Sequence, residues 1–125
     1  MMLKEIGTSL QSQGIGTLGA DIFLGLMPDK PDNCIALFEY AGSPPDLHWE
    51  GEYPGLQVRV RDKSYPAGKA KIEQIARVLH GLHETVLGGT RYLLVKARGS
   101  PEVLKRDNNN RVEFFVNFEI IKESD

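Results

Sequence analysis

A six-residue segment near the N-terminus has the spacing of a nucleotide-binding motif. Residues 14–19 read Gly-Ile-Gly-Thr-Leu-Gly, which matches the dinucleotide pattern G-x-G-x-x-G. That motif needs a strand before it and a helix after it, because the helix N-terminus then meets the pyrophosphate. Here residues 2–13 have the spacing of a short amphipathic helix and residues 21–27 that of a strand. The reversed order predicts an architectural turn without a bound nucleotide.

Two groups containing histidine could bind a metal. His80 and His83 lie three residues apart near the end of a predicted helix, but two histidines supply at most half of a zinc site. Asp46, His48 and Glu50 occupy alternate positions in a proline-rich loop, which is weak support for a metal site. No nucleophile pattern and no P-loop is present in the sequence. We therefore predict no catalytic residue, no metal and no cofactor.

The composition bounds the class of protein. With 125 residues, of which 41% are hydrophobic and 26% charged, residues 1–125 are predicted to form a single folded domain. The net charge is −2, whereas a protein that holds phosphates is usually basic over one face. One local basic cluster exists, and its simplest interpretation is a solvated face. Its members are Arg59, Arg61, Lys63, Lys69 and Lys71.

The only cysteine opens an apolar run. Cys34 excludes an internal disulfide, and the residues after it predict a buried, inert thiol, which fits a reducing cytoplasm. The sequence has no charged-then-apolar N-terminal signal, and no apolar run approaches the ~20 residues that cross a bilayer. We expect a soluble protein that is not exported by the usual route.

The chain is organised around residues 53–87, which predict a strand, a turn and a helix. Residues 56–61 alternate apolar and polar side chains, as in a strand with one buried face. Ser64 can cap the helix and Pro66 suits its first turn. The apolar stripe of the helix is Ile72, Ile75, Ala76, Leu79 and Leu82.

Four further strands are predicted on either side of this unit. Residues 22–27 and 34–40 could form an antiparallel hairpin, and the last two strands are residues 91–98 and 112–121. Residues 99–111 form a long polar connection that has too little apolar surface to hold one conformation. The predicted fold is an α+β domain: a mostly antiparallel five-stranded sheet with two helices on one face, in the order α-β-β-β-α-β-β.

Two side-chain predictions follow from these elements. In the last strand, Phe114, Val116 and Phe118 should face the core and Phe115 should point away from it. Trp49 in the proline-rich loop should either pack the loop down or contact a partner.

Several stretches together resemble the small minor capsid proteins of tailed phages and prophages. They are Gly14–Gly19, Met27–Asp32, Glu39–Gly42 with Pro44-Pro45, Tyr53–Arg61, Arg106-Asp107 and Arg111–Phe118. Nearly the whole chain is covered, and Pro-Gly-Leu-Gln-Val-Arg-Val-Arg at residues 54–61 is the most distinctive part. This family is more distantly similar to phage tail terminator, or tail completion, proteins.

The resemblance implies a structural protein of the virion, assembled in the cytoplasm of a bacterial host, without catalysis or cofactor. Tail terminators have the same element order and form hexameric rings that close the tail tube and join it to the head. The expected partners are copies of the chain itself, tail-tube proteins and head-connector proteins, with no membrane and no specific nucleic acid. The resemblance leaves open whether the chain acts on the head side or the tail side.

The contact residues are inferred from exposure and charge alone. They are Arg59, Arg61, Val103, Leu104, Arg106, Asp107 and Arg111. Two other classes of function remain open on the sequence: a small-molecule module or enzyme that binds a nucleotide or metal, and a nucleic-acid binder that uses the basic cluster. Binding of nucleotides or divalent metals would raise the melting temperature, and nucleic-acid binding would depend on salt.

Overall fold

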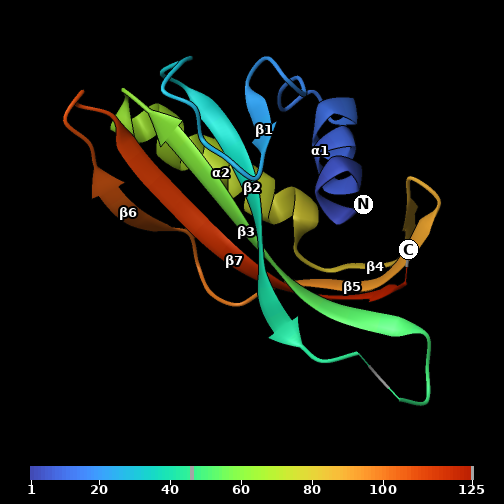
Figure 1. Cartoon of the computed structure of the whole chain (residues 1–125). Helices are drawn as coiled ribbons and strands as arrows, with labels where there is room; N and C mark the ends of the chain where they lie inside the picture. Colours follow the sequence, from blue (N-terminus) through green and yellow to red (C-terminus); the bar gives the residue numbers. More distant parts are fainter. Residues whose placement is uncertain (46, 125) are drawn as a thin grey trace.

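A curled, mixed β-sheet with two helices makes up the chain (Figure 1). The structure is a computed structural model that describes residues 1–45 and 47–124. The sheet runs in the order β1-β2-β3-β7-β5-β4, and β6 also pairs with β7. The elements are α1 Met2–Ser12, β1 Ile22–Leu24, β2 Cys34–Ser43, β3 Gly51–Asp62, α2 Tyr65–Leu79, β4 Leu82–Leu87, β5 Thr90–Ala97, β6 Glu102–Arg106 and β7 Val112–Glu123. No helix in the described part of the chain is long and apolar enough to cross a membrane.

The α+β class and the two helices are confirmed, whereas the five-stranded sheet is corrected to seven strands. The predicted hairpin of residues 22–27 and 34–40 is also wrong. β1 pairs parallel to β2, in the register Ile22↔Ile35 to Leu24↔Leu37. The strands are parallel because the turn at residues 25–33 crosses back before β2 begins instead of reversing the chain directly.

The helix of the central unit ends earlier than the sequence suggests. Ser64 Oγ accepts a hydrogen bond from the Ala67 amide at 3.2 Å, so the predicted cap is present. The helix ends at Leu79, and Gly81 turns the chain with a φ of +88°. Residues 82–87, which the sequence assigned to the end of the helix, form β4 and pair antiparallel with β5. A short amphipathic strand after a helix continues its apolar spacing, which explains the misassignment.

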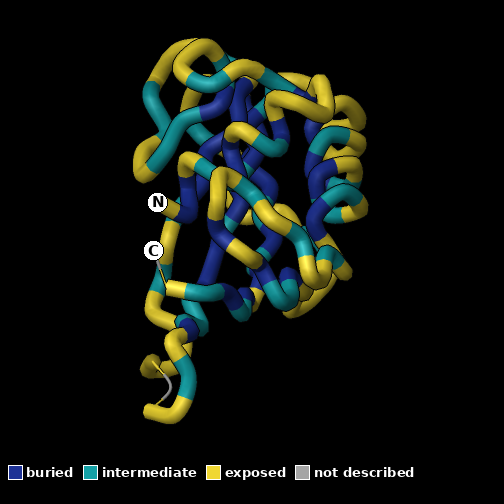
Figure 2. Tube along the Cα trace, turned by 90° about the vertical axis from the view of Figure 1, so that its right-hand side faces the viewer, coloured by how far each residue is buried: buried dark blue, intermediate teal, exposed yellow. Residues whose placement is uncertain are grey.

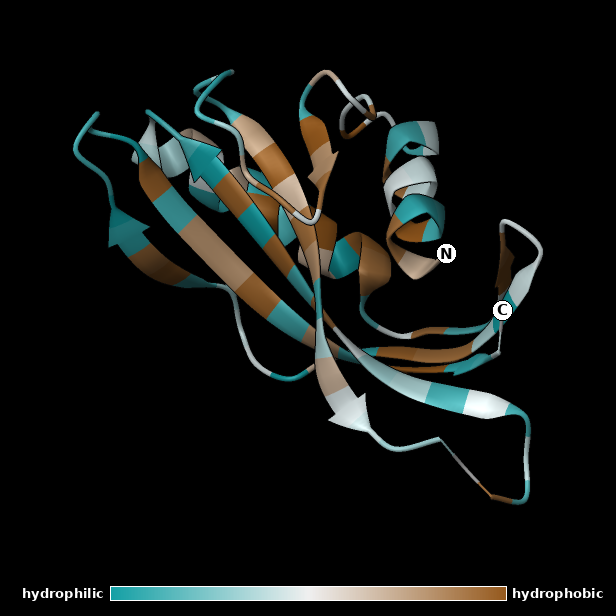
Figure 3. Ribbon diagram, in the orientation of Figure 1, coloured by the Kyte–Doolittle hydropathy of each residue, from teal (hydrophilic) through white to brown (hydrophobic). Residues whose placement is uncertain are grey.

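The core lies on one face of the sheet, beneath both helices. β7 alternates as predicted: Phe114, Val116 and Phe118 are buried, and Phe115 is half-buried on the other face. Figure 3 shows hydrophobic segments where the strands pass the helices. One cluster joins these strands to α1 and α2 through Ile6, Leu10, Ile72, Ile75 and Leu79.

The first helix is fixed to the sheet by a partly buried carboxylate. Glu5 accepts hydrogen bonds from Thr90 Oγ1 at 2.6 Å and from the Tyr92 hydroxyl at 2.8 Å. Thr90 and Tyr92 lie in the first part of β5, so this contact joins the N-terminal helix to a strand about 85 residues away in sequence. The predicted docking of the N-terminal helix is therefore present, and its polar part comes from β5.

Candidate interaction surfaces

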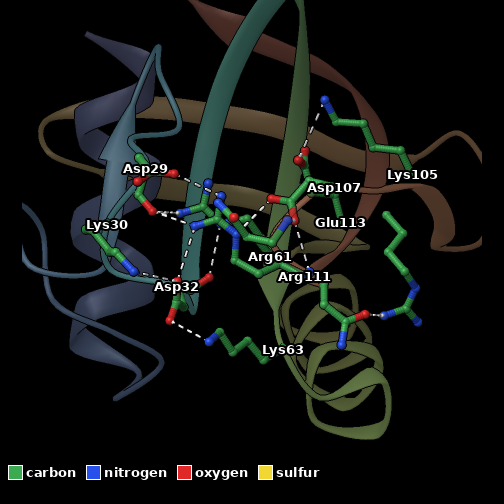
Figure 4. Close-up of polar contacts among 12 residues, drawn as sticks. Asp29, Lys30, Asp32, Arg61, Lys63, Lys105, Asp107, Arg111 and Glu113 are labelled. Carbon is green, nitrogen blue, oxygen red and sulfur yellow. Dashed lines mark hydrogen bonds and ion pairs between the residues drawn. The ribbon is translucent and has the colours of Figure 1, made fainter.

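A buried arginine organises one end of the sheet (Figure 4). Arg61 lies near the end of β3 and is only 4% exposed. Its guanidinium donates to the backbone carbonyls of Pro28, Asp29, Pro31 and Asp32, over distances of 2.6 to 3.2 Å. A guanidinium has five donors in a rigid fork, so one side chain can hold several carbonyls of a single turn. Arg61 thus shapes the turn at residues 28–33 and does not belong to a solvated basic face, which corrects that interpretation.

A second arginine, Arg111, lies directly before β7, contacts the same turn and is also 4% exposed. Its Nε donates to Asp107 Oδ2 at 2.8 Å, and its terminal nitrogens lie 3.0 Å from Asp29 Oδ1 and 3.3 Å from Asp32 Oδ1. Figure 4 shows the two guanidinium groups side by side between the turn at 28–33 and the turn before β7. We call these two arginines with Asp29, Asp32 and Asp107 the arginine clasp. Paired carboxylates and carbonyls are what make two buried like charges tolerable.

Two carboxylates of the arginine clasp have lowered pKa values, Asp107 because of Arg111 and Asp32 because of two lysines outside the clasp. Desolvation acts to raise the pKa of Asp107, but hydrogen bonds from the Arg111 amide and guanidinium outweigh it and hold the pKa below its usual value. The pKa of Asp32 is lowered, chiefly by its hydrogen bond from Lys30 and also by Lys63. Asp107 and Arg111 were inferred from the sequence as partner contacts, and the structure places them in this internal network. A contact with another protein stays a prediction for both.

The face of the sheet without helices carries a small polar and aromatic network. The Arg59 guanidinium lies 4.7 Å from the centre of the Phe38 ring, within range of a cation–π interaction. Its Nε donates to Gln57 Oε1 at 2.7 Å, and Gln57 Nε2 donates to Asn117 Oδ1 at 3.0 Å. These bonds hold Arg59 half-exposed across three strands, in a position from which it can still meet a partner.

The predicted irregular loop at residues 99–111 contains a strand. β6 pairs antiparallel with the first part of β7, from Glu102↔Phe115 to Arg106↔Val112, and β5 pairs with the second part. All five residues of β6 are exposed, among them Val103 at 47% and Leu104 at 39%. The backbone of β7, rather than side-chain burial, holds this segment in the sheet. The predicted irregular connection is therefore corrected to a strand over Glu102–Arg106.

A shallow groove separates β6 from α2. It encloses about 260 Å³ and is lined by Tyr65, Ile72, Val103 and Phe114, among others. The Tyr65 and Phe114 rings meet edge to face with their centres 5.2 Å apart. The rim carries Lys69 and Glu73 of α2 with Ser100 and Pro101. This volume is below the ~300–1,000 Å³ of typical small-molecule pockets, so the groove suits a side chain from another protein.

The hairpin between β2 and β3 projects away from the rest of the molecule; we call residues 41–53 the arm. Figure 2 shows it as a mostly exposed extension, and Figure 3 shows its strands as largely polar. The Trp49 ring packs against Tyr53, with ring centres 6.2 Å apart, and lies where a Cβ on Gly51 would fall. Of the two roles predicted for Trp49, the structure shows the first: its ring packs within the loop. Leu47, beside it, is 94% exposed.

The glycine-rich turn lies between a helix and a strand, as the sequence predicts. Its amides bond to the chain itself: Thr17 N donates to Asp21 Oδ1 at 2.6 Å and Leu18 N donates to Gln11 Oε1 at 2.9 Å. Gly14 and Gly19 have positive φ, whereas Gly16 is tight because a Cβ there would meet the Asp21 side chain at 2.8 Å. These contacts support an architectural turn.

The candidate metal ligands are dispersed. His80 Nδ1 accepts a hydrogen bond from the Ala97 amide at 2.9 Å. His83 Nδ1 lies 3.2 Å from the Gly81 carbonyl. Within residues 1–45 and 47–124, no three histidine, cysteine or acidic residues gather as a metal site would need. Asp46 lies outside the described residues.

Comparisons with known proteins place this fold in a family. The family model described as bacteriophage tail terminator protein matches residues 9–124. Among solved structures, the chain is similar to a chain from the virion of a native gene transfer agent particle. The TM-score is 0.66 at 15% identity, over 85% of this chain and 81% of that chain, which shows a shared fold. No curated protein matches the sequence. Since the family model spans nearly all of the 125 residues, the chain belongs to the bacteriophage tail terminator protein family.

Proposed function

We propose that the chain is a non-enzymatic structural protein that completes the phage tail as a hexameric ring. The observation that carries the proposal is the family match over residues 9–124. The shared fold with a chain from a gene transfer agent virion supports a role inside a particle. In this role the chain contacts copies of itself, the tail tube and the head connector. It assembles in the bacterial host cytoplasm and remains in the virion.

The surfaces described above divide the predicted contact residues into two groups. Arg61, Asp107 and Arg111 stabilise the arginine clasp, so their effect on assembly is expected to act through the fold. Arg59, Val103, Leu104 and Arg106 are at least partly exposed and remain the proposed direct contacts.

The test is a disruption of the gene in the phage or prophage that encodes the chain. Without the protein, electron microscopy should show tails of uncontrolled length or tails unattached to heads, and supplying the wild-type chain should restore joined particles. A synonymous change at the same codon is the matched control. Normal particles in the disrupted strain would contradict the tail-completion role. Light scattering of the purified chain, alone and with tail tubes, measures its oligomeric state, which tests the ring independently of the gene disruption.

A further inference from the structure

Four of the large exposed apolar side chains lie at two places on this chain, the groove between β6 and α2 and the arm. Seven such residues are present in the described part of the chain, and one exposed leucine alone would need no explanation. However, Tyr65 and Val103 line the groove between β6 and α2, and Leu104 is next to Val103 on the same strand. Leu47 stands at the tip of the arm and is the most exposed of the seven. One place is a projection and the other is a hollow.

We propose that the arm of one copy docks into the groove between β6 and α2 of the next copy, with Leu47 as its apolar anchor. This inference rests on the proposed ring and names its interface. An interface between different patches of identical chains is heterologous, and it closes into a ring when the rotation between copies permits. Figure 1 shows the arm and β6 at opposite ends of the sheet, as a head-to-tail interface requires.

The shape of each partner suits the other. Trp49 lies back over Gly51 and Tyr53, which stiffens the arm and leaves Leu47 pointing outward at low conformational cost. The groove has an aromatic floor formed by Tyr65 and Phe114, with Val103 as one wall. An apolar anchor in an aromatic-lined pocket is the arrangement typical of the centre of a protein interface.

Charge also favours this pairing. Residues 41–52 contain Asp46, Glu50 and Glu52 and no lysine or arginine. The groove is lined by one cation and one acid, Lys69 and Glu73. The adjacent strand β6 adds Glu102, Lys105 and Arg106, so the groove and β6 together carry one more cation than acids. Glu52 is paired with Lys122 within the chain, so Asp46 and Glu50 supply the negative charge of the arm. This charge favours contact with the groove and β6 over contact with a second arm.

β6 also offers a backbone edge. Its pairs in the described sheet are with β7 alone, so its second edge carries hydrogen-bonding groups that face away from the sheet. Natural proteins seldom leave such an edge next to exposed apolar side chains unless something covers it. The extended strands of an incoming arm can cover it while Leu47 enters the groove.

Cysteine cross-linking tests the pairing, because the one native cysteine is buried. Burial also raises the pKa of the Cys34 thiol, which makes it a poor nucleophile. The double variant Leu47→Cys with Val103→Cys, treated with a short bismaleimide, should give a ladder of covalent oligomers that ends at the size of the ring. Each single variant should stay uncrosslinked. The matched control is Leu47→Cys with Val86→Cys, since Val86 is an exposed valine at 64% on the distant strand β4.

Three outcomes would overturn the pairing. The first is that the control pair, cysteines at Leu47 and Val86, gives a ladder of cross-linked oligomers while the pair at Leu47 and Val103 does not. The second is that Leu47→Cys alone gives cross-linked dimers. The third is that light scattering shows rings but the pair at Leu47 and Val103 gives no ladder. In the last case the ring stands and only this interface is wrong. A chain that stays monomeric even with tail tubes contradicts both the pairing and the ring. The tail-completion role is still judged by the phenotype of the gene disruption.

Discussion

The turn at residues 28–33 and the tip of the arm lie at opposite ends of the hairpin strands β2 and β3, and they are built in opposite ways. The turn is polar, and two buried arginines bind its carbonyls and carboxylates. The tip has an exposed leucine, and its main internal contact is the packing of Trp49 on Tyr53 and Gly51. The turn at residues 28–33 is thus held by the rest of the fold. The tip of the arm makes few contacts with the rest of the chain.

This contrast reverses the usual expectation about surface loops. The turn at 28–33 has the composition of a mobile loop, yet Arg61 satisfies four of its carbonyls. Internal hydrogen-bond partners decide which loops belong to the folded state, because a buried polar group without a partner is costly. An exposed side chain such as Leu47 adds little to the stability of the isolated chain, so any larger free-energy contribution would have to come from a contact with another molecule.

Substitutions in the hydrophobic core should cause the largest losses in the free energy of unfolding, against which the smaller losses below can be compared. Phe114→Ala or Phe118→Ala should lower the free energy of unfolding by about 3–5 kcal/mol, because each removes a fully buried ring from beneath a helix. Phe115→Ala, on the other face of the same strand, should cost distinctly less. Urea unfolding of the three variants measures the difference. Equal losses at Phe114 and Phe115 would mean that the strand is buried on both faces.

Removal of an arginine from the arginine clasp should be the next largest effect. Arg111→Ala should cost about 2–3 kcal/mol, because it breaks charge-assisted bonds to three aspartates and leaves β7 without its link to the turn at 28–33. Arg106→Ala is the matched control: this exposed residue bonds to Asn110 alone in the described contacts, so its change should stay within about 0.5 kcal/mol. If the two variants were equally stable, the arginine clasp would make no measurable contribution to the stability of the fold.

Acid should weaken the clasp and leave the arm unaffected. The pKa of Asp107 is lower in the folded chain than in the unfolded one, so its contribution is complete above the unfolded value of ~3.9 and disappears as pH falls through the folded value. Asp107→Asn should therefore lower the melting temperature at pH 7, and the gap from wild type should narrow as the pH drops below about 4. A gap that stays constant down to pH 2 would exclude this carboxylate as the cause.

The sequence predicted the regular parts of this fold and missed the parts set by neighbours. The alternation in β3 and β7 and the Ser64 cap are local signals, and the structure confirms them. β6 has no alternation because all of its residues are exposed; it is a strand only because β7 offers a second edge. Replacement of residues 101–109 by a short Asn-Gly turn would remove β6 and Asp107, so it should lower the free energy of unfolding.

The arginine clasp was hidden for the same reason. In the sequence, Arg61 is a polar position of an alternating strand and Arg111 ends a polar loop, and both patterns are typical of solvent exposure. Their burial depends on the turn at 28–33 folding over them, a contact about 30 residues away for Arg61 and about 80 for Arg111. The clue that was present is the composition of that turn, in which prolines and aspartates present carbonyls and carboxylates to a cation.

The smallest expected change in stability is also the sharpest test of the arm. Leu47→Ser removes an apolar side chain that is already 94% exposed, so the free energy of unfolding should change by less than about 0.5 kcal/mol. Assembly should suffer instead: light scattering should show a shift from rings toward monomers, and tails should be left unjoined in the complemented phage. Leu47→Met, which keeps the apolar volume, should assemble normally.

Val86→Ser is the control for exposure, because Val86 on β4 is a 64% exposed apolar residue that does not line the groove between β6 and α2. It should leave both stability and assembly unchanged. If Leu47→Ser lowered the melting temperature by as much as Arg111→Ala, the arm would belong to the fold in the same sense as the arginine clasp. The contrast between the two regions would then disappear. If Leu47→Ser and Val86→Ser reduced assembly equally, the effect would reflect general surface hydrophobicity, and the contact at the arm tip would lose its support.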